Sequence, residues 1–141
     1  MKIVLCADHA GFELKQQIKE YLSQNYQLED VGAHQIDNED SYVLYAQKAS
    51  KKVLENAENK GIFVCGSGVG MNIVANKQKG VRAVLAFQKD LAVKSREHNN
   101  ANVLCLGGRF INFDDAKEII DAFLQTEFLG GKYQKRVEDI E

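Results

Sequence analysis

A cysteine followed at once by a glycine-rich turn is the first feature of this sequence that could carry chemistry. Cys65 ends an apolar run, and the stretch CGSGVG at 65–70 then leads into a pattern typical of a helix. Glycines allow positive φ angles and a close approach of the backbone to a ligand. Backbone amides that lead into a helix can point at an anion or at a developing oxyanion. The stretch therefore indicates either a nucleophile or base held over a ligand, or a tight turn after a buried cysteine.

Three familiar phosphate- or nucleotide-binding motifs do not fit this stretch. A Walker P-loop requires GxxxxGK[ST], but neither Lys-Ser nor Lys-Thr follows the glycines. A low-molecular-weight phosphatase loop, C-x5-R, would need an arginine where the chain has Met71. A dinucleotide fingerprint requires GxGxxG, whereas the spacing here is GxGxG, and the next strand ends in Ala86-Phe87 instead of a ribose-binding acid. The first two classes are excluded and the third is disfavoured.

Further residues that could act on a ligand lie near the ends of the other predicted elements and in the tail: Asp8, His9, His98, Asn99, Arg109, Lys132 and Arg136. Each has a simpler explanation when taken alone. Asp8 could cap a helix, His98 could be a partly buried histidine at a helix end, and Arg109 could pair with a carboxylate. Lys132 and Arg136, four residues apart, could form an ordinary solvated helix face.

Short apolar runs alternate with longer amphipathic ones, which is typical of a parallel sheet covered by helices on both faces. Strands are predicted at 2–7, 27–31, 61–65, 81–86 and 102–106. Helices are predicted at 11–24, 42–58, 70–79, 88–98 and 113–125, and a short helical tail follows Gly130-Gly131. A polar loop at 32–41 contains His34, which we expect to be solvated. We therefore expect a single domain over 1–141, a three-layer α/β/α fold with a five-stranded parallel Rossmann-like sheet.

Two helix ends have suitable signals. Gly80 is expected to end the third helix in a left-handed conformation. Asn112, with Asp115 three residues later, is expected to cap the last long helix.

Length, charge and cysteine usage restrict the class of protein. A chain of 141 residues can bury a real core, and a net charge of −2 with a pI near 5.9 suggests no general affinity for nucleic acid or acidic membranes. No apolar run approaches the roughly 18 residues needed to span a bilayer. The first residues become polar too soon for a signal peptide, so we expect a cytoplasmic protein. Cys6, Cys65 and Cys105 form no CxxC motif and indicate neither a disulfide framework nor a zinc site; two of them are expected to be small buried residues.

Motifs that follow one another along nearly the whole chain resemble the type B ribose-5-phosphate isomerase family, which also includes galactose-6-phosphate isomerase subunits. They are DHAGFxLK at 8–15, CGSGVG at 65–70, ANK at 75–77, GVRA at 80–83, HNNANV at 98–103, GGR at 107–109 and GGKYQxRV at 130–137. Each motif is weak alone, but the ordered series is specific.

The resemblance implies interconversion of D-ribose 5-phosphate and D-ribulose 5-phosphate through an enediolate, with no metal or organic cofactor. Such a reaction needs a base near C2, donors for the enediolate oxygen, an acid/base at the ring oxygen and cations for the phosphate. By the family's pattern Cys65 is the base, Ser67 and the amides of 66–70 stabilise the enediolate, and His98 opens the sugar ring. A branch without this cysteine has a glutamate where this chain has Met71, which places the chain in the cysteine branch.

The resemblance also implies a set of substrate-binding residues: Asp8, His9, Tyr42, Gly66, Ser67, Gly68, Val69, Gly70, Asn99, Arg109, Lys132 and Arg136. It implies a homodimer or homotetramer whose sites are shared between subunits, with the tail at 130–141 reaching across. Two alternatives remain open: an isomerase of a six-carbon sugar phosphate such as allose or galactose 6-phosphate, and a non-catalytic phosphate- or nucleotide-binding module.

Topology gives an independent reason for shared sites. Cys65 is at the carboxyl end of a predicted strand, whereas His98 ends a helix and precedes the fifth strand, which places it at the amino edge of the sheet. A five-residue strand is roughly 16 Å long, too far for both residues to touch one small sugar. If both are catalytic, His98 must come from a second subunit, and an isologous dimer is the smallest active unit.

The chain departs from the family's pattern at three positions. Lys132 stands where an arginine is usual, which keeps the charge but loses a bidentate grip on phosphate. Tyr133 replaces a common histidine, and Val43 replaces a proline after Tyr42. These changes concern phosphate affinity and the shape of the 32–45 segment, and they leave the proton-transfer centre intact.

Overall fold

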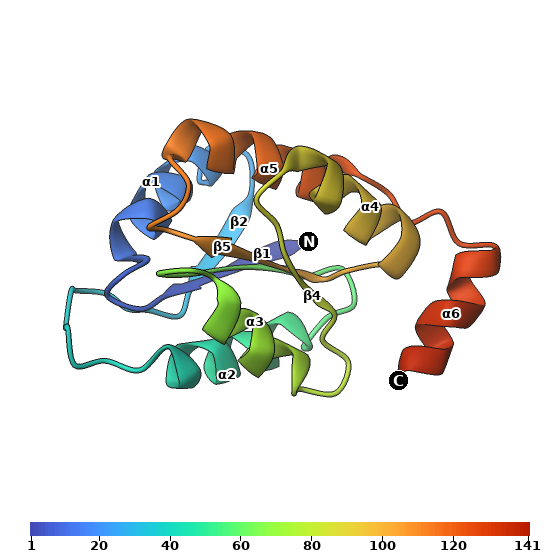
Figure 1. Ribbon diagram of the computed structural model, residues 1–141, viewed down its shortest axis with the longest axis horizontal. Helices are drawn as coiled ribbons and strands as arrows, with labels where there is room; N and C mark the ends of the chain where they lie inside the picture. Colours follow the sequence, from blue (N-terminus) through green and yellow to red (C-terminus); the bar gives the residue numbers. More distant parts are fainter.

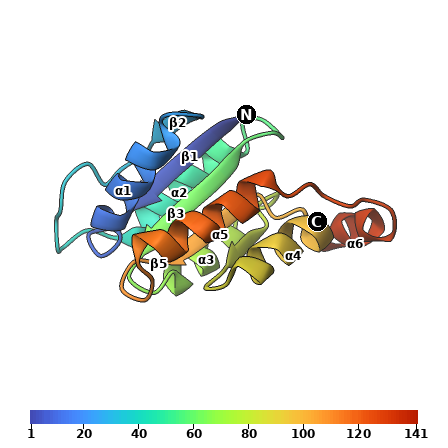
Figure 2. The same ribbon diagram turned by 90° about the horizontal axis from the view of Figure 1, so that it is seen from above.

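The computed structural model describes all 141 residues and contains one parallel β-sheet. Its strands are β1 (Lys2–Ala7), β2 (Gln27–Asp30), β3 (Lys60–Cys65), β4 (Ala83–Leu85) and β5 (Val103–Gly107). Their order is β2-β1-β3-β5-β4, and every neighbouring pair is parallel. The carboxyl ends of the strands therefore lie along one edge, where open parallel sheets bind their ligands (Figure 2).

Six helices complete the fold. They are α1 (Phe12–Leu22), α2 (Tyr42–Val53), α3 (Val69–Asn76), α4 (Lys89–Asn99), α5 (Phe113–Gln125) and α6 (Lys132–Ile140). Helices α1, α4 and α5 cover one face of the sheet and α2 and α3 the other, whereas α6 stands apart beyond the end of α4 (Figure 1). This arrangement confirms the predicted three-layer α/β/α fold with its helical tail. None of the helices combines the length and the apolar character needed to cross a membrane.

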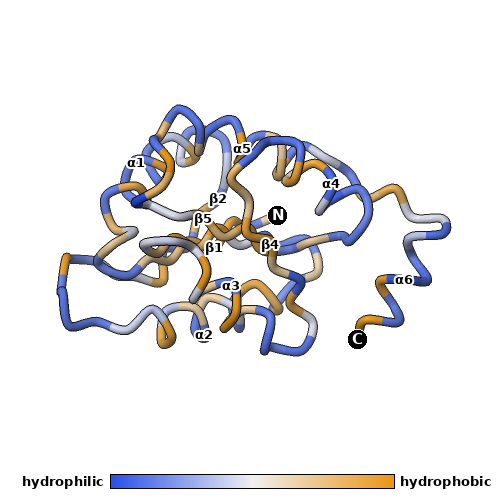
Figure 3. The backbone as a smooth tube through the Cα atoms, viewed as in Figure 1, coloured by the Kyte–Doolittle hydropathy of each residue, from blue (hydrophilic) through white to orange (hydrophobic).

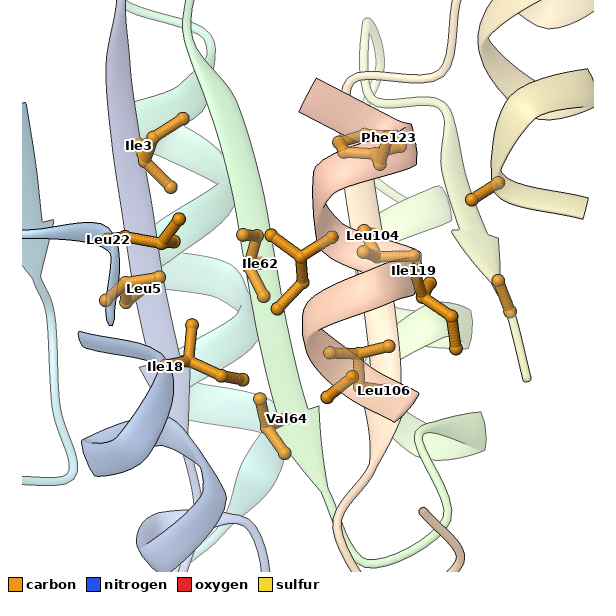
Figure 4. Close-up of a cluster of buried hydrophobic side chains, with 14 of the residues drawn as sticks. Ile3, Leu5, Ile18, Leu22, Ile62, Val64, Leu104, Leu106, Ile119 and Phe123 are labelled. Carbon is orange, nitrogen blue, oxygen red and sulfur yellow. The ribbon is translucent and has the colours of Figure 1, made fainter. Parts of the chain in front are cut away.

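The strands carry two hydrophobic layers, because successive side chains of a strand point to opposite faces of the sheet. On one face, alternate strand residues such as Leu5, Ile62 and Leu104 meet Ile18 of α1 and Ile119 of α5 (Figure 4). On the other face, the intervening strand residues pack against α2 and α3; they are Val4, Cys6, Phe63, Cys65, Val103 and Cys105. Cys65 is the last strand residue of this second layer at the carboxyl edge of the sheet.

Helix α2 is shorter than predicted, because it ends at Val53 rather than at residue 58. Two asparagine side chains replace helical hydrogen bonds in the turn that follows. Asn56 Oδ1 accepts from the amide of Glu58 at 2.9 Å, and Asn59 Nδ2 donates to the carbonyl of Lys52 at 3.3 Å. Asparagine commonly ends helices in this way, since its side chain competes for backbone partners.

Helix α3 and the strand after it are also shorter than predicted. Asn76 ends the helix and bonds both backbone groups of Ala83, at 3.0 and 2.8 Å, which ties the helix end to the start of β4. Gly80 has the expected positive φ, +92°, but it lies in the turn beyond the cap residue Lys77 and does not end the helix. The predicted cap of α5 is confirmed, since Asn112 Oδ1 accepts from the amide of Asp115 at 2.8 Å.

A fully buried lysine anchors the loop at 32–41, which is mostly hydrophilic (Figure 3). Lys15 of α1 donates from Nζ to Asp30 Oδ1 at 2.8 Å and to the carbonyl of Ala33, the second residue of the loop. Burial alone would raise the pKa of Asp30, but hydrogen bonds from Lys15, from the amide of Gly32 and from Lys19 lower it below its ordinary value. The ion pair therefore fixes the end of β2 and the start of the loop.

Replacing Lys15 by methionine is expected to lower the free energy of unfolding by about 3 kcal/mol, because it removes the only buried cation beside the Asp30 carboxylate. The amide of Gly32 and the exposed Lys19 remain as its partners. Equilibrium unfolding in urea measures this loss. Lys19→Met is the matched control, since Lys19 bonds the other oxygen of Asp30 at 3.1 Å with its side chain 45% exposed; its loss should stay below about 1 kcal/mol. Equal losses in the two variants would contradict the special role of Lys15.

Candidate active site

A pocket of about 500 Å³ opens at the carboxyl edge of the sheet, above the ends of β1, β3 and β5. The residues that line it come from the ends of these strands, from the turns that follow them and from α2 and α3. They are Asp8, His9, Ala10, Tyr42, Cys65, Gly66, Ser67, Val69, Gly70, Ile73, Arg109 and Phe110. Most of the residues predicted from the first two thirds of the chain therefore meet in one place.

Cys65 differs from the other two cysteines in its access to this pocket. Its side chain packs with the α2 and α3 layer, the residue is 4% exposed, and it lines the pocket floor. Cys6 and Cys105 are wholly buried, and burial raises the pKa of both thiols well above the ordinary value, so both stay protonated. This confirms the expectation that two of the three cysteines are small core residues.

The glycine-rich turn after Cys65 is held closely against the turn after β5. The amide of Gly108 donates to the carbonyl of Cys65 at 2.8 Å, and the amide of Arg109 donates to that of Gly66 at 3.0 Å. A Cβ atom on Gly107 would lie 2.7 Å from the carbonyl oxygen of Ser67, so only glycine permits this approach. The two turns thus form one rigid unit at the pocket.

Gly68 and Gly70 shape the turn in different ways. Gly68 has a φ of +81° at the start of α3, and a Cβ there would lie 2.5 Å from the side chain of Leu85. Unlike its neighbours in the turn, Gly68 does not line the pocket. A Cβ on Gly70 would lie 2.6 Å from the ring of Tyr42, which explains how that tyrosine reaches the pocket. Ser67 Oγ accepts from the amide of Val69 at 3.2 Å, and its hydroxyl hydrogen remains available to a ligand.

Asp8 both stabilises the turn before α1 and lies at the pocket. Its Oδ1 accepts from the amides of Ala10 and Gly11, both at 3.0 Å, and so it stabilises the turn into α1. The same residue lines the pocket, although it is 6% exposed. Asp8 therefore does not cap α1, whose N-cap residue Gly11 has no side-chain cap bond, but it stabilises the preceding turn and also lies at the site.

His9 is held by a residue that sequence reasoning missed. Its ring Nδ1 lies 2.8 Å from Asp40 Oδ1, and its amide donates to the same oxygen at 3.2 Å. Asp40 belongs to the polar loop at 32–41, and no pattern in the sequence pairs it with position 9. Ala10, Ile73 and Phe110 were also missed, because small or apolar residues in a pocket wall carry no chemical signal.

Asp8, His9 and Asp40 are also the group that could hold a metal ion, since each offers a ligand atom and these atoms lie within 4.8 Å of one another. In the fold these groups already serve as hydrogen-bond partners. Asp8 Oδ1 accepts from two amides, and His9 Nδ1 is bonded to Asp40. The hydrogen bonds within the protein therefore account for why these three side chains lie together.

Arg109 lies at the pocket without an acidic partner. No carboxylate lies within 4.0 Å of its guanidinium, so the alternative that it serves an internal ion pair does not apply. A cation free of a counter-ion at the mouth of a pocket suits an anionic ligand.

The remaining predicted residues lie at the opposite end of the chain's fold. His98 is in the last turn of α4, and its ring stacks on that of Tyr133 of α6 with 4.4 Å between centroids and 13° between planes. The charged groups of Lys132 and Arg136 lie over the same tyrosine ring, at 5.2 and 5.6 Å. None of these residues, nor Asn99, lines the pocket that contains Cys65. The predicted site is thus divided into two groups within one chain.

Comparison with known proteins identifies the class to which this fold and pocket belong. The sequence profile of the ribose/galactose isomerase family matches residues 3–140, so the chain belongs to that family.

Three relatives give the similarity in detail. A ribose-5-phosphate isomerase B of Escherichia coli K12 is 39% identical over 140 residues, which is 99% of this chain and 93% of that protein. The crystal structure of a ribose 5-phosphate isomerase from Thermotoga maritima shares 42% identity with a TM-score of 0.94, over 99% of this chain and 96% of that one. The structure of a ribose-5-phosphate isomerase B from Mycoplasma genitalium with bound ribulose-5-phosphate shares 39% identity with a TM-score of 0.95, over 99% and 93%. The resemblance drawn from the motifs is confirmed.

Proposed function

We propose that the protein interconverts D-ribose 5-phosphate and D-ribulose 5-phosphate. The observation that carries the proposal is the thiol of Cys65 on the floor of a pocket, directly before the turn at 66–70. Family membership and relatives named ribose-5-phosphate isomerase support the substrate class. Three free cysteines suit a reducing compartment, and we place the reaction in the cytoplasm.

Cys65 is proposed as the base, acting as the thiolate. It removes the proton from C2 of the open-chain aldose, and an enediolate forms. The thiol formed in this step can exchange its proton with solvent before it delivers a proton to C1. The oxygen on C1 gains a proton, and the hydroxyl on C2 loses one to become the ketone. The hydroxyl of Ser67 and amides of the turn at 66–70 would stabilise the charge on the enediolate oxygen. No redox partner or cofactor is needed for this balance.

Binding of the phosphate needs cations, and opening of the sugar ring needs an acid/base; the residues proposed for these roles lie at two ends of the fold. His9 and Arg109 lie in the pocket, while His98, Asn99, Lys132 and Arg136 lie at the α4 and α6 end. We propose a homodimer or homotetramer in which the second group enters the pocket of another subunit, with His98 opening the ring. The distance between the groups within one chain supports this arrangement.

Isomerisation in heavy water tests the proposed reaction. Incubation with ribose 5-phosphate is expected to place deuterium at C2 of the aldose and at C1 of the ketose, because the proton passes through the thiol. Mass spectrometry or NMR measures this exchange, and unphosphorylated ribose and allose 6-phosphate are the control substrates.

We expect allose 6-phosphate to react with a kcat/KM at least about tenfold lower than that for ribose 5-phosphate. Absence of exchange with every substrate would indicate a binding module, and faster turnover of the six-carbon sugar would reassign the substrate.

A further inference from the structure

Asp40 contacts His9 and no other side chain through hydrogen bonds or ion pairs. Its Oδ1 is the acceptor for the ring nitrogen Nδ1 at 2.8 Å and for the backbone amide of the same residue at 3.2 Å. Its Oδ2 is buried and has no hydrogen-bond partner. The Asp40 side chain is 6% exposed, against 26% for that of His9. Because His9 is the only hydrogen-bonding partner of this buried carboxylate, any influence of Asp40 on a ligand is expected to pass through His9.

The backbone around Asp40 keeps this carboxylate in place. The amide of Asp40 donates to the carbonyl of Asp37 at 3.0 Å, and Ser41 then caps α2 by accepting from the amide of Val43 at 3.2 Å. At its other end the same loop is anchored by buried Lys15. The loop therefore presents Asp40 to His9 from a fixed position.

The contact decides which ring nitrogen faces the ligand. An ionised carboxylate can only accept, so the bond at 2.8 Å requires the proton on Nδ1. Nε2 is then the nitrogen that remains for the pocket, which His9 lines together with Arg109. With Nδ1 bonded to the carboxylate, Nε2 is the ring nitrogen available for a hydrogen bond to a phosphate bound in the pocket.

We propose that Asp40 is a positioning residue that holds His9 with Nε2 directed to the substrate phosphate. The inference rests on the proposed isomerase function for its substrate, but the coupling between the two residues is a property of the free protein. The proposal concerns ground-state binding of the phosphate, and proton transfer at Cys65 is not affected.

A double-mutant cycle tests the proposal in the chain of residues 1–141. Asp40→Ala is expected to raise KM for ribose 5-phosphate about tenfold and to change kcat less than about threefold, in line with the loss of one charged hydrogen bond. Asp40→Ala in the His9→Ala background should change KM less than about twofold, because the proposed effect of Asp40 on the phosphate passes through the ring. The bond from the backbone amide of residue 9 to Asp40 Oδ1 is lost on Asp40→Ala in both backgrounds, so it cancels in the cycle. Asp40→Asn should recover most of the affinity, since its amide oxygen still accepts from Nδ1–H. Glu39→Gln, at an exposed neighbouring carboxylate, is the charge control and should behave as wild type.

The ¹⁵N NMR shifts of the His9 ring provide a second readout, which a purely structural role of Asp40 would not move. The wild type should show Nδ1 protonated, and Asp40→Ala should shift the tautomer toward a proton on Nε2. Inorganic phosphate is the binding probe, and its Kd should rise in Asp40→Ala and His9→Ala alike. Additive effects in the cycle, or an unchanged tautomer in Asp40→Ala, would overturn the proposal. If the wild type shows no isomerase activity, the proposed function fails, while the NMR and phosphate titrations still decide the coupling.

Discussion

Replacing Cys65 by alanine is expected to lower kcat for ribose 5-phosphate by about 10³-fold and to change KM less than about threefold. General bases typically contribute about 10²–10⁴-fold to a rate, and Cys65 is the only thiol that lines the pocket. The groups proposed to bind the phosphate are unchanged in this variant, so substrate should still bind. Steady-state kinetics together with the heavy-water exchange separate loss of chemistry from loss of binding.

Cys105→Ala is the matched control for this variant. Cys105 is a thiol in the same hydrophobic layer, on the strand next to β3, but it is wholly buried and lies away from the pocket. Its replacement should cost about 1 kcal/mol of stability and leave kcat within about threefold of wild type. Near-full activity in Cys65→Ala would overturn the proposed mechanism.

Mixing two inactive variants should restore activity if the sites are shared between subunits. Cys65→Ala and His98→Ala each inactivate every site of their own dimers. A hybrid dimer regains one intact site, which combines Cys65 of one subunit with His98 of the other. Random exchange of equal amounts should therefore yield about one quarter of wild-type activity, since half of the dimers are hybrids and half of their sites are complete. The assay is run after mild dissociation and reassociation of the mixture.

Two controls make this experiment decisive. Each variant taken alone through the same treatment should stay inactive, and exchange of subunits should be followed directly by native mass spectrometry of differently tagged chains. A mixture that demonstrably forms hybrids but regains no activity would contradict sharing of His98. The physical basis is the position of His98 against Tyr133 at the α4 and α6 end, away from the pocket of its own chain.

Most of the fold could be predicted because its signals are local and repeated. The apolar runs that form β1, β3 and β5 are buried on both faces, which is the pattern of inner strands in a parallel sheet. The ends of α2 and α3 were less predictable, since side chains such as Asn59 and Asn76 end them through contacts with residues distant in sequence or beyond the helix. Periodicity does not record such contacts.

Site residues could be predicted only where the residue type itself indicates a catalytic or ligand-binding role. Cys65, Asp8, His9 and Arg109 follow strands, so the carboxyl-edge rule brings them to one pocket. The contacts of Asp40 with His9 and of Lys15 with the loop could not be predicted, because a carboxylate in a loop and a lysine on a helix are ordinarily solvated. Their burial depends on how the loop at 32–41 folds back, which tertiary structure alone decides.

The separation of the pocket from α6 has a consequence for how activity depends on the amount of protein. A single chain carries the thiol at one end of its fold and the cluster of His98, Lys132, Tyr133 and Arg136 at the other. Under the proposed sharing, dissociation does not halve the number of working sites but abolishes them all. Specific activity then becomes a measure of association, and it falls on dilution as the subunits separate.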